Sequence, residues 1–173
     1  MQQNKRLITI SMLSAIAFVL TFIKFPIPFL PPYLTLDFSD VPSLLATFTF
    51  GPVAGIIVAL VKNLLNYLFS MGDPVGPFAN FLAGASFLLT AYAIYKNKRS
   101  TKSLITGLII ATIVMTIVLS ILNYFVLLPL YGMIFNLADI ASNLQAIIVA
   151  GIITCNNLKG IVISIVFILT YTR

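Results

Sequence analysis

Polar side chains that interrupt the apolar stretches of this sequence are the residues best able to do chemistry. Asn156 and Lys159 are three positions apart, so they share one face of a helix. Further polar residues interrupt other apolar stretches, namely Lys62, Asn63, Asn80 and Asn123. Amides donate and accept hydrogen bonds, and an ammonium donates three. This set is therefore equipped for hydrogen bonding to a ligand rather than for proton transfer.

Most residue types that enzymes use for acid–base chemistry are missing. The chain has no His and no Glu, and its four acids are all Asp. It contains no phosphate-binding GxxxxGK[ST] loop, and the single Cys155 cannot form an intrachain disulfide or a CxxC metal motif. We therefore predict no catalytic residue, no metal site and no enzyme activity. Cys155 is expected to be a buried apolar residue.

The composition predicts a membrane protein. Of the 173 residues, 60% are hydrophobic and 8% are charged, whereas about a quarter of a typical soluble domain is charged. A membrane-spanning helix needs about 20 apolar residues. Apolar stretches cover residues 7–25, 36–50, 52–71, 77–95 and 104–128, and a last span lies within 137–171. We predict one all-α, polytopic domain over residues 1–173, with six transmembrane helices.

Positive charges fall in clusters between these stretches. If residues 36–50 cross the membrane, then Lys5, Arg6, the basic run at 96–102 and Arg173 lie on one side, and all four Asp lie on the other. Lys and Arg favour the cytoplasmic side, which predicts a multi-pass membrane protein with both termini in the cytoplasm. Such clusters do not form a stripe that could follow a phosphate backbone, so no nucleic-acid partner is expected.

A proline-rich segment at residues 26–42 follows the first helix and cannot be continuous helix, because each Pro lacks a backbone donor. It is predicted to be an external loop between helices 1 and 2 that acts as a lid carrying Tyr33, Thr35 and Asp37. Beneath it, the six-span arrangement places Asn80, Asn123, Asn156 and Lys159 at a similar outer depth. The plainer alternative is that each Asn only joins neighbouring helices.

The pocket predicted there suits a neutral, flat ligand rich in hydrogen-bonding groups. A cationic ligand would favour buried acids, but all four Asp are expected in outer loops. A strongly anionic ligand would favour Arg, and no Arg lies within a predicted span. Lys159 has no acid in its own span, and Lys62 is expected either to pair with a loop carboxylate or to reach toward water.

Several motifs in order resemble the riboflavin-specific S-component of bacterial energy-coupling-factor (ECF) transporters. The proline-rich loop ends in Leu36-Asp-Phe-Ser-Asp-Val-Pro42, and Gly51-Pro-Val-Ala-Gly55, Lys62-Asn-Leu-Leu and Asn156-x-x-Lys159-Gly160 follow. The resemblance covers most of the chain. It implies a riboflavin-binding membrane subunit, without a cofactor of its own, that works with a transmembrane coupling protein and two cytoplasmic ATPases.

The resemblance also implies roles for individual residues. Asn123, Asn156 and Lys159 would contact the flavin, and the loop residues Tyr33, Leu34 and Thr35 would close over it. Two rival functions remain at this point: an S-component for a different vitamin, and a small secondary transporter. The second would ordinarily need a membrane carboxylate for proton coupling, and none is evident in the predicted spans.

Small residues on the first helix indicate a docking surface. Ser11 and Ala15 are four positions apart, and small residues at this spacing let another helix approach closely in the bilayer. The resemblance implies that this surface binds the coupling protein, since the family has an Ala-x-x-x-Ala pattern there. Ala17 lies nearby and Ser14 lies on the adjoining turn, and the alternative is that these small residues serve packing within the six-span bundle.

Overall fold

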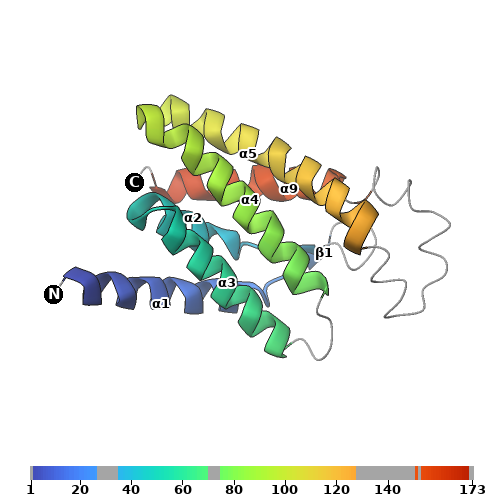
Figure 1. The fold of residues 1–173 in the computed structure, drawn as a ribbon, viewed down its shortest axis with the longest axis horizontal. Helices are drawn as coiled ribbons and strands as arrows, with labels where there is room; N and C mark the ends of the chain where they lie inside the picture. The colour runs from blue at the N-terminus through green and yellow to red at the C-terminus, as the bar shows by residue number, and fades with distance from the viewer. Residues whose placement is uncertain (1, 27–34, 70–74, 128–150, 152, 172–173) are drawn as a thin grey trace.

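Helices make up nearly all of the part of the chain that the computed structural model describes, which is residues 2–26, 35–69, 75–127, 151 and 153–171. This confirms the all-α prediction. Figure 1 shows the helices packed into one bundle, with some of them inclined to the others. In chain order they are α1 (Gln2–Leu20), α2 (Asp40–Phe50), α3 (Pro52–Phe69), α4 (Val75–Lys98), α5 (Thr101–Leu122), a π-helical turn η1 (Asn123–Leu127) and α9 (Ile153–Tyr171).

Four of the described segments are long and apolar enough to cross a membrane: α3, α4, α5 with its continuation to Val126, and α9. This supports a polytopic membrane protein. The other two expected spans, α1 and α2, are present as helices, but they are not among these four. The 11 residues of α2 extend only about 16 Å at 1.5 Å per residue, and α1 begins with polar and basic residues. Whether α1 and α2 cross fully stays a prediction.

The described part of the proline-rich segment is not continuous helix, as predicted, because residues 35–39 lie outside any helix. A short antiparallel pair joins β1 (Phe25–Pro26) to β2 (Thr35–Leu36), with Phe25 opposite Leu36. Helical structure resumes at Asp40, and Pro42 lies in the first turn of α2, where its missing N–H breaks no helical hydrogen bond. The β pair therefore holds together the two ends of the loop that joins α1 to α2.

Helices α2 and α3 form a tight hairpin joined by Gly51, whose φ of 96° favours glycine. The two helices approach so closely that a side chain at Gly55 would overlap the hydroxyl of Thr47 and lie 2.8 Å from the carbonyl oxygen of Ser43. This close contact holds the first turn of α3 against the middle of α2.

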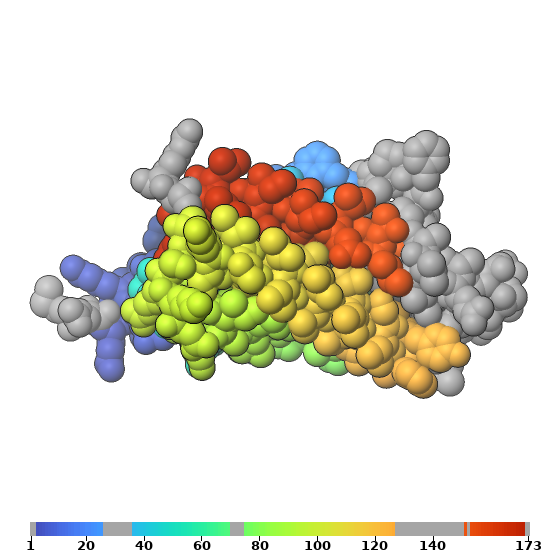
Figure 2. Space-filling model, turned by 90° about the horizontal axis from the view of Figure 1, so that it is seen from above, coloured from blue at the N-terminus to red at the C-terminus, as the bar shows by residue number. Residues whose placement is uncertain are grey.

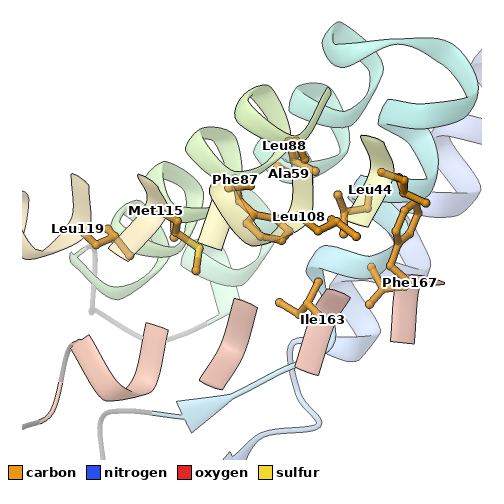
Figure 3. Close-up of a cluster of buried hydrophobic side chains, with 14 residues drawn as sticks. Leu44, Ala59, Phe87, Leu88, Leu108, Met115, Leu119, Ile163 and Phe167 are labelled. Carbon is orange, nitrogen blue, oxygen red and sulfur yellow. The ribbon is translucent and has the colours of Figure 1, made fainter. Parts of the chain in front are cut away.

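Buried apolar side chains from α2, α3, α4, α5 and α9 form the main core (Figure 3). Leu44, Phe87, Leu108, Ile163 and Phe167 are among its members, and all are essentially inaccessible to solvent. Helices α5 and α9 run beside each other on the face seen in Figure 2. They approach each other tightly where Gly160 meets Thr112, since a Cβ at Gly160 would lie 2.5 Å from a methyl carbon of Thr112.

The start of α1, the connection between α4 and α5, and the end of α9 lie at the same end of the bundle (Figure 1). Lys5, Arg6 and the basic run at 96–102 therefore share this end. The Arg6 guanidinium also donates a 3.0 Å hydrogen bond to the carbonyl oxygen of Phe50, which fixes α1 to the end of α2. Arg173 lies outside the described residues.

Candidate ligand-binding site

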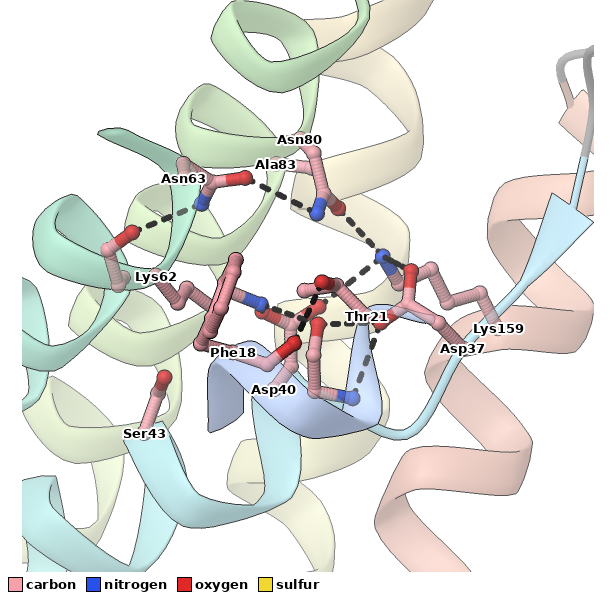
Figure 4. A network of polar contacts seen from close by, with 12 residues as sticks. Phe18, Thr21, Asp37, Asp40, Ser43, Lys62, Asn63, Asn80, Ala83 and Lys159 are labelled. Carbon is pink, nitrogen blue, oxygen red and sulfur yellow. Dashed lines mark hydrogen bonds and ion pairs between the residues drawn. The ribbon is translucent and has the colours of Figure 1, made fainter. Parts of the chain in front are cut away.

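A buried ion pair joins the start of α2 to α3. The ammonium of Lys62 is fully buried and contacts the Oδ1 atom of Asp40 directly. It also donates to the hydroxyl of Ser39 over 2.6 Å. That hydroxyl donates in turn to the carboxylate of Asp37, so Asp37 is linked to Lys62 through Ser39 (Figure 4).

A second ammonium reaches the same group of residues from α9. The Nζ atom of Lys159 lies 3.3 Å from Oδ2 of Asp37 and 3.1 Å from Oδ2 of Asp40. It also donates a 2.6 Å hydrogen bond to Oδ1 of Asn80 on α4. Asp40 is therefore shared by the two lysines, one at each carboxylate oxygen.

Amide side chains extend the network across the bundle. Asn80 donates through Nδ2 to Oδ1 of Asn63, 3.1 Å away, and Asn63 donates over 2.8 Å to the carbonyl oxygen of Ala59. Both hydrogen-bonding ends of the Asn80 amide are thus engaged, one by α9 and one by α3. We call Asp37, Ser39, Asp40, Lys62, Asn63, Asn80 and Lys159 the polar network.

Local sequence explains why the acids point inward. Asp37 accepts a 2.9 Å hydrogen bond from the backbone N–H of Ser39, the usual way in which an Asp stabilises a turn. Asp40 lies in the first turn of α2, where a negative charge is favoured by the helix dipole. On the far side, a Cβ at Gly84 of α4 would come within 3.0 Å of Asp40, so the glycine leaves room for the carboxylate.

The network is balanced in charge. It holds two carboxylates and two ammonium groups, and isolated charges in such a buried place would be very unfavourable. The Asp37 carboxylate accepts hydrogen bonds from the hydroxyl and the backbone N–H of Ser39, and it lies 3.3 Å from the Lys159 ammonium. Its negative charge is therefore partnered within the bundle.

These findings correct one expectation and confirm another. Asp37 and Asp40 were expected in an outer loop, but they are buried between helices. They supply the counter-charge that Lys159 lacks in its own helix, and the expectation failed because these partners lie far away in the chain. Lys62 pairs with a carboxylate, which confirms the first of its two alternatives. Asp73 and Asp139 lie outside the described residues.

Comparison with known proteins identifies the family. The family model for the substrate-specific component of ECF transporters matches residues 5–171, which is nearly the whole chain. The chain belongs to the substrate-specific (S) components of ECF transporters.

Individual relatives agree with this assignment over almost their full lengths. The chain is 94% identical over 173 residues to the riboflavin transporter RibU of Staphylococcus aureus, covering all of this chain and 92% of the relative. It is 45% identical to the riboflavin transporter FmnP of Bacillus subtilis, covering 98% and 91%. A solved structure, described as the S component of a bacterial ECF transporter, superposes with a TM-score of 0.88 at 88% identity, covering 99% and 95%.

Two of the candidate ligand contacts in this S component meet directly. Asn80 and Lys159 are hydrogen-bonded, so the structure brings them together although one belongs to α4 and the other to α9. Asn156 is buried on the same face of α9 as Lys159, as the spacing predicts. Cys155 is also buried, as expected.

The candidate Asn123 makes its described contact outside the polar network. Asn123 is half-buried at the start of η1 and donates to the carbonyl oxygen of Leu119 in its own helix, 2.8 Å away. Thr35 contributes its backbone to the β pair. Tyr33 and Leu34 lie outside the described residues.

The docking candidates on α1 separate into two faces. Ser11 and Ala15 are exposed, whereas Ser14 and Ala17 are buried against the rest of the bundle. Ser14 and Ala17 therefore pack within the bundle, whereas Ser11 and Ala15 lie on the outer surface of α1.

Sequence reasoning missed Asp37, Ser39 and Asp40 as members of the network. The equal number of charges could have indicated them: two lysines lie within apolar stretches, and two aspartates lie close together near the start of α2. A buried lysine needs an anionic partner, so the four charges were a plausible set.

Proposed function

We propose that this S component binds riboflavin in the outer half of its helical bundle and delivers it for import. The observation that carries the proposal is the charge-balanced network around Lys159 and Asn80, which offers amide and ammonium groups without net charge. Such a site suits an uncharged, flat ring with several hydrogen-bonding groups. The names of the two relatives, both riboflavin transporters, identify which such molecule it is.

In this proposal Lys159, Asn156, Asn123 and Asn80 donate or accept hydrogen bonds at the polar edge of the ring. The loop residues Tyr33, Leu34 and Thr35 close over the bound molecule from outside. Support for the first group comes from the burial of Asn156 and Lys159 on one face of α9. Support for the loop comes from its position, because β2 leads directly into the network through Asp37.

Transport itself requires other proteins. The chain has no phosphate-binding loop, so we propose that a transmembrane coupling protein and two cytoplasmic ATPases supply the energy. Ser11 and Ala15, on the exposed face of α1, form the surface proposed to dock the coupling protein. The grouping of basic residues at one end of the bundle supports placing both termini in the cytoplasm.

Titration of the detergent-solubilised protein with riboflavin tests the binding step. We expect flavin fluorescence to be quenched as the protein binds it, with an end point at one riboflavin per chain. Fluorescence that is retained at equal concentrations of folded protein and riboflavin, well above micromolar, would contradict the proposal.

Reconstitution of the isolated chain in liposomes tests the need for partners. A secondary transporter would accumulate riboflavin alone, driven by an ion gradient. The buried carboxylates Asp37 and Asp40 are each paired with lysine, which makes them poor proton carriers. We therefore expect binding without accumulation, and concentrative uptake by the chain alone would favour the secondary transporter instead.

A further inference from the structure

Lys62 does not contact Lys159 directly, but both lysines contact Asp40. The side chain of Lys62 is 0% exposed, and its ammonium contacts Asp40 and Ser39. Asp40 uses Oδ1 for Lys62 and Oδ2 for Lys159. Lys62 therefore acts on Lys159 through a single shared carboxylate.

The count of charges shows what Lys62 contributes. With Lys62 present, two carboxylates face two ammonium groups, and the site has no net charge. Without it, Asp37 and Asp40 would share Lys159 alone, and the site would carry one net negative charge. Loss of the Asp40 charge instead would leave Lys62 and Lys159 facing Asp37, with one net positive charge.

We propose that Lys62 is a positioning residue that sets the net charge of the ligand site to zero and so selects ligands whose buried ring is uncharged. The inference rests on the proposed function, because it takes Lys159 as a ligand contact. Lys62 holds the Asp40 carboxylate in place, and the Asp40 carboxylate orients the Lys159 ammonium. Selectivity for an uncharged ring follows from the balance of all four groups rather than from any one contact.

A purely structural role for Lys62 makes a different prediction. If the lysine only holds α2 against α3, its removal weakens the binding of every flavin by a similar factor. If it sets the charge of the site, its removal and the removal of the Asp40 charge shift the preference between neutral and anionic ligands in opposite directions. The ratio of two affinities therefore separates the two roles.

The experiment measures the affinities of two probes for each variant of the full chain in detergent. One probe is riboflavin, whose ring is neutral at pH 7. The other is its analogue with a hydroxyl in place of the 8-methyl group, whose ring is an anion at that pH. The variants are Lys62→Met, Asp40→Asn, the double substitution, and Lys102→Met, which removes an exposed lysine at the other end of the bundle.

In Lys62→Met we expect the affinity for the anion, relative to riboflavin, to fall about tenfold. In Asp40→Asn the same ratio should rise about tenfold. This is the size of effect that Coulomb's law gives for unit charges about 10 Å apart at an effective dielectric constant near 20. The double substitution restores the balance and should return the ratio to that of the unaltered chain, and Lys102→Met should not change it.

An unchanged ratio in both single variants would overturn the inference and leave Lys62 a structural role. If Lys62→Met does not fold, Asp40→Asn decides alone, because an unchanged ratio there overturns the inference equally. Failure of the proposed function looks different, since the unaltered chain would then bind neither flavin.

Discussion

The Lys159 ammonium lies 3.3 Å from the Asp37 carboxylate, although 122 positions separate the two residues in the chain. Asp37 directly follows β2, which ends the proline-rich loop. The last helix is thus tied to the segment that leads from this loop into α2. A ligand that forms a hydrogen bond with Lys159 would also affect Asp37, which lies at the end of the loop proposed to cover the ligand.

Replacement of Lys159 by Ala should weaken riboflavin binding by about 1–3 kcal/mol, the scale of losing a hydrogen bond to a charged group. The change also leaves Asp37 and Asp40 with Lys62 as their remaining network cation. Fluorescence titration of the purified variant measures the loss. The control is Lys102→Ala, which removes an exposed lysine. Equal binding by folded Lys159→Ala would show that Lys159 is structural.

Replacement of Asn80 and replacement of Asn123 should have different effects. Asn80→Ala breaks the hydrogen bonds to both Asn63 and Lys159 inside the bundle, so we expect a loss of stability of about 1–3 kcal/mol. Asn123→Ala removes a half-buried bond within one helix and should cost less than about 1 kcal/mol.

Thermal unfolding in detergent measures these stabilities, and riboflavin titration measures binding. Asn123→Ala, like Asn156→Ala, should weaken binding by as much as Lys159→Ala or less. Asn123→Ala is then a variant that binds poorly yet unfolds nearly normally. Unchanged binding in that variant would remove Asn123 from the ligand contacts.

Gly160→Ala should loosen the contact between α5 and α9. The added Cβ would lie 2.5 Å from a methyl carbon of Thr112, closer than packed atoms tolerate, and overpacking of this kind costs about 1–3 kcal/mol. Thr112→Ala in the same chain removes that methyl and should restore part of the stability. Ile161→Ala, on the exposed side of α9, is the control and should change the melting temperature less than Gly160→Ala does.

Ala15→Trp should block assembly with the coupling protein and stop uptake while riboflavin binding stays nearly intact. The reason is that Ala15 is exposed on α1, away from the buried face of that helix. Ala17→Trp is the matched comparison, because Ala17 is 0% exposed and a large side chain there should prevent folding. Co-purification with the coupling protein and flavin titration test both variants. Loss of flavin binding in Ala15→Trp would contradict a role for this surface in docking alone.

Helix positions could be predicted well from the sequence because long apolar stretches ending at charges or prolines leave few alternatives. Residues 77–95 were expected as one span, and α4 covers Val75–Lys98. The start of α2 was placed four residues too early, at 36. The carboxylate of Asp37 binds the backbone N–H of Ser39, and this turn delays the helix until Asp40.

The partners within the network could not be predicted in the same way. Helical spacing places Asn156 and Lys159 on one face, but it does not say which distant residue that face meets. The pairing of Lys159 with Asp37 and Asn80 depends on how α2, α4 and α9 pack together. Exposure of Ser11 and Ala15 likewise depends on which side of α1 faces α3, and the small residues Ser14 and Ala17 fit the inner side equally well by type.

The α2–α3 hairpin has a consequence for how the chain enters the bilayer during synthesis. A lysine at the centre of a helix opposes insertion by about 2.5–3.5 kcal/mol on translocon scales. Asp40 and Lys62 lie on the two arms of this hairpin, joined by Gly51, so both arms can leave the translocon together with their charges already neutralised. Lys159 is synthesised with α9, after α2 and α4, so its partners Asp37 and Asn80 are already present when it enters the bundle. The order of synthesis thus matches the order in which each buried charge finds its counterpart.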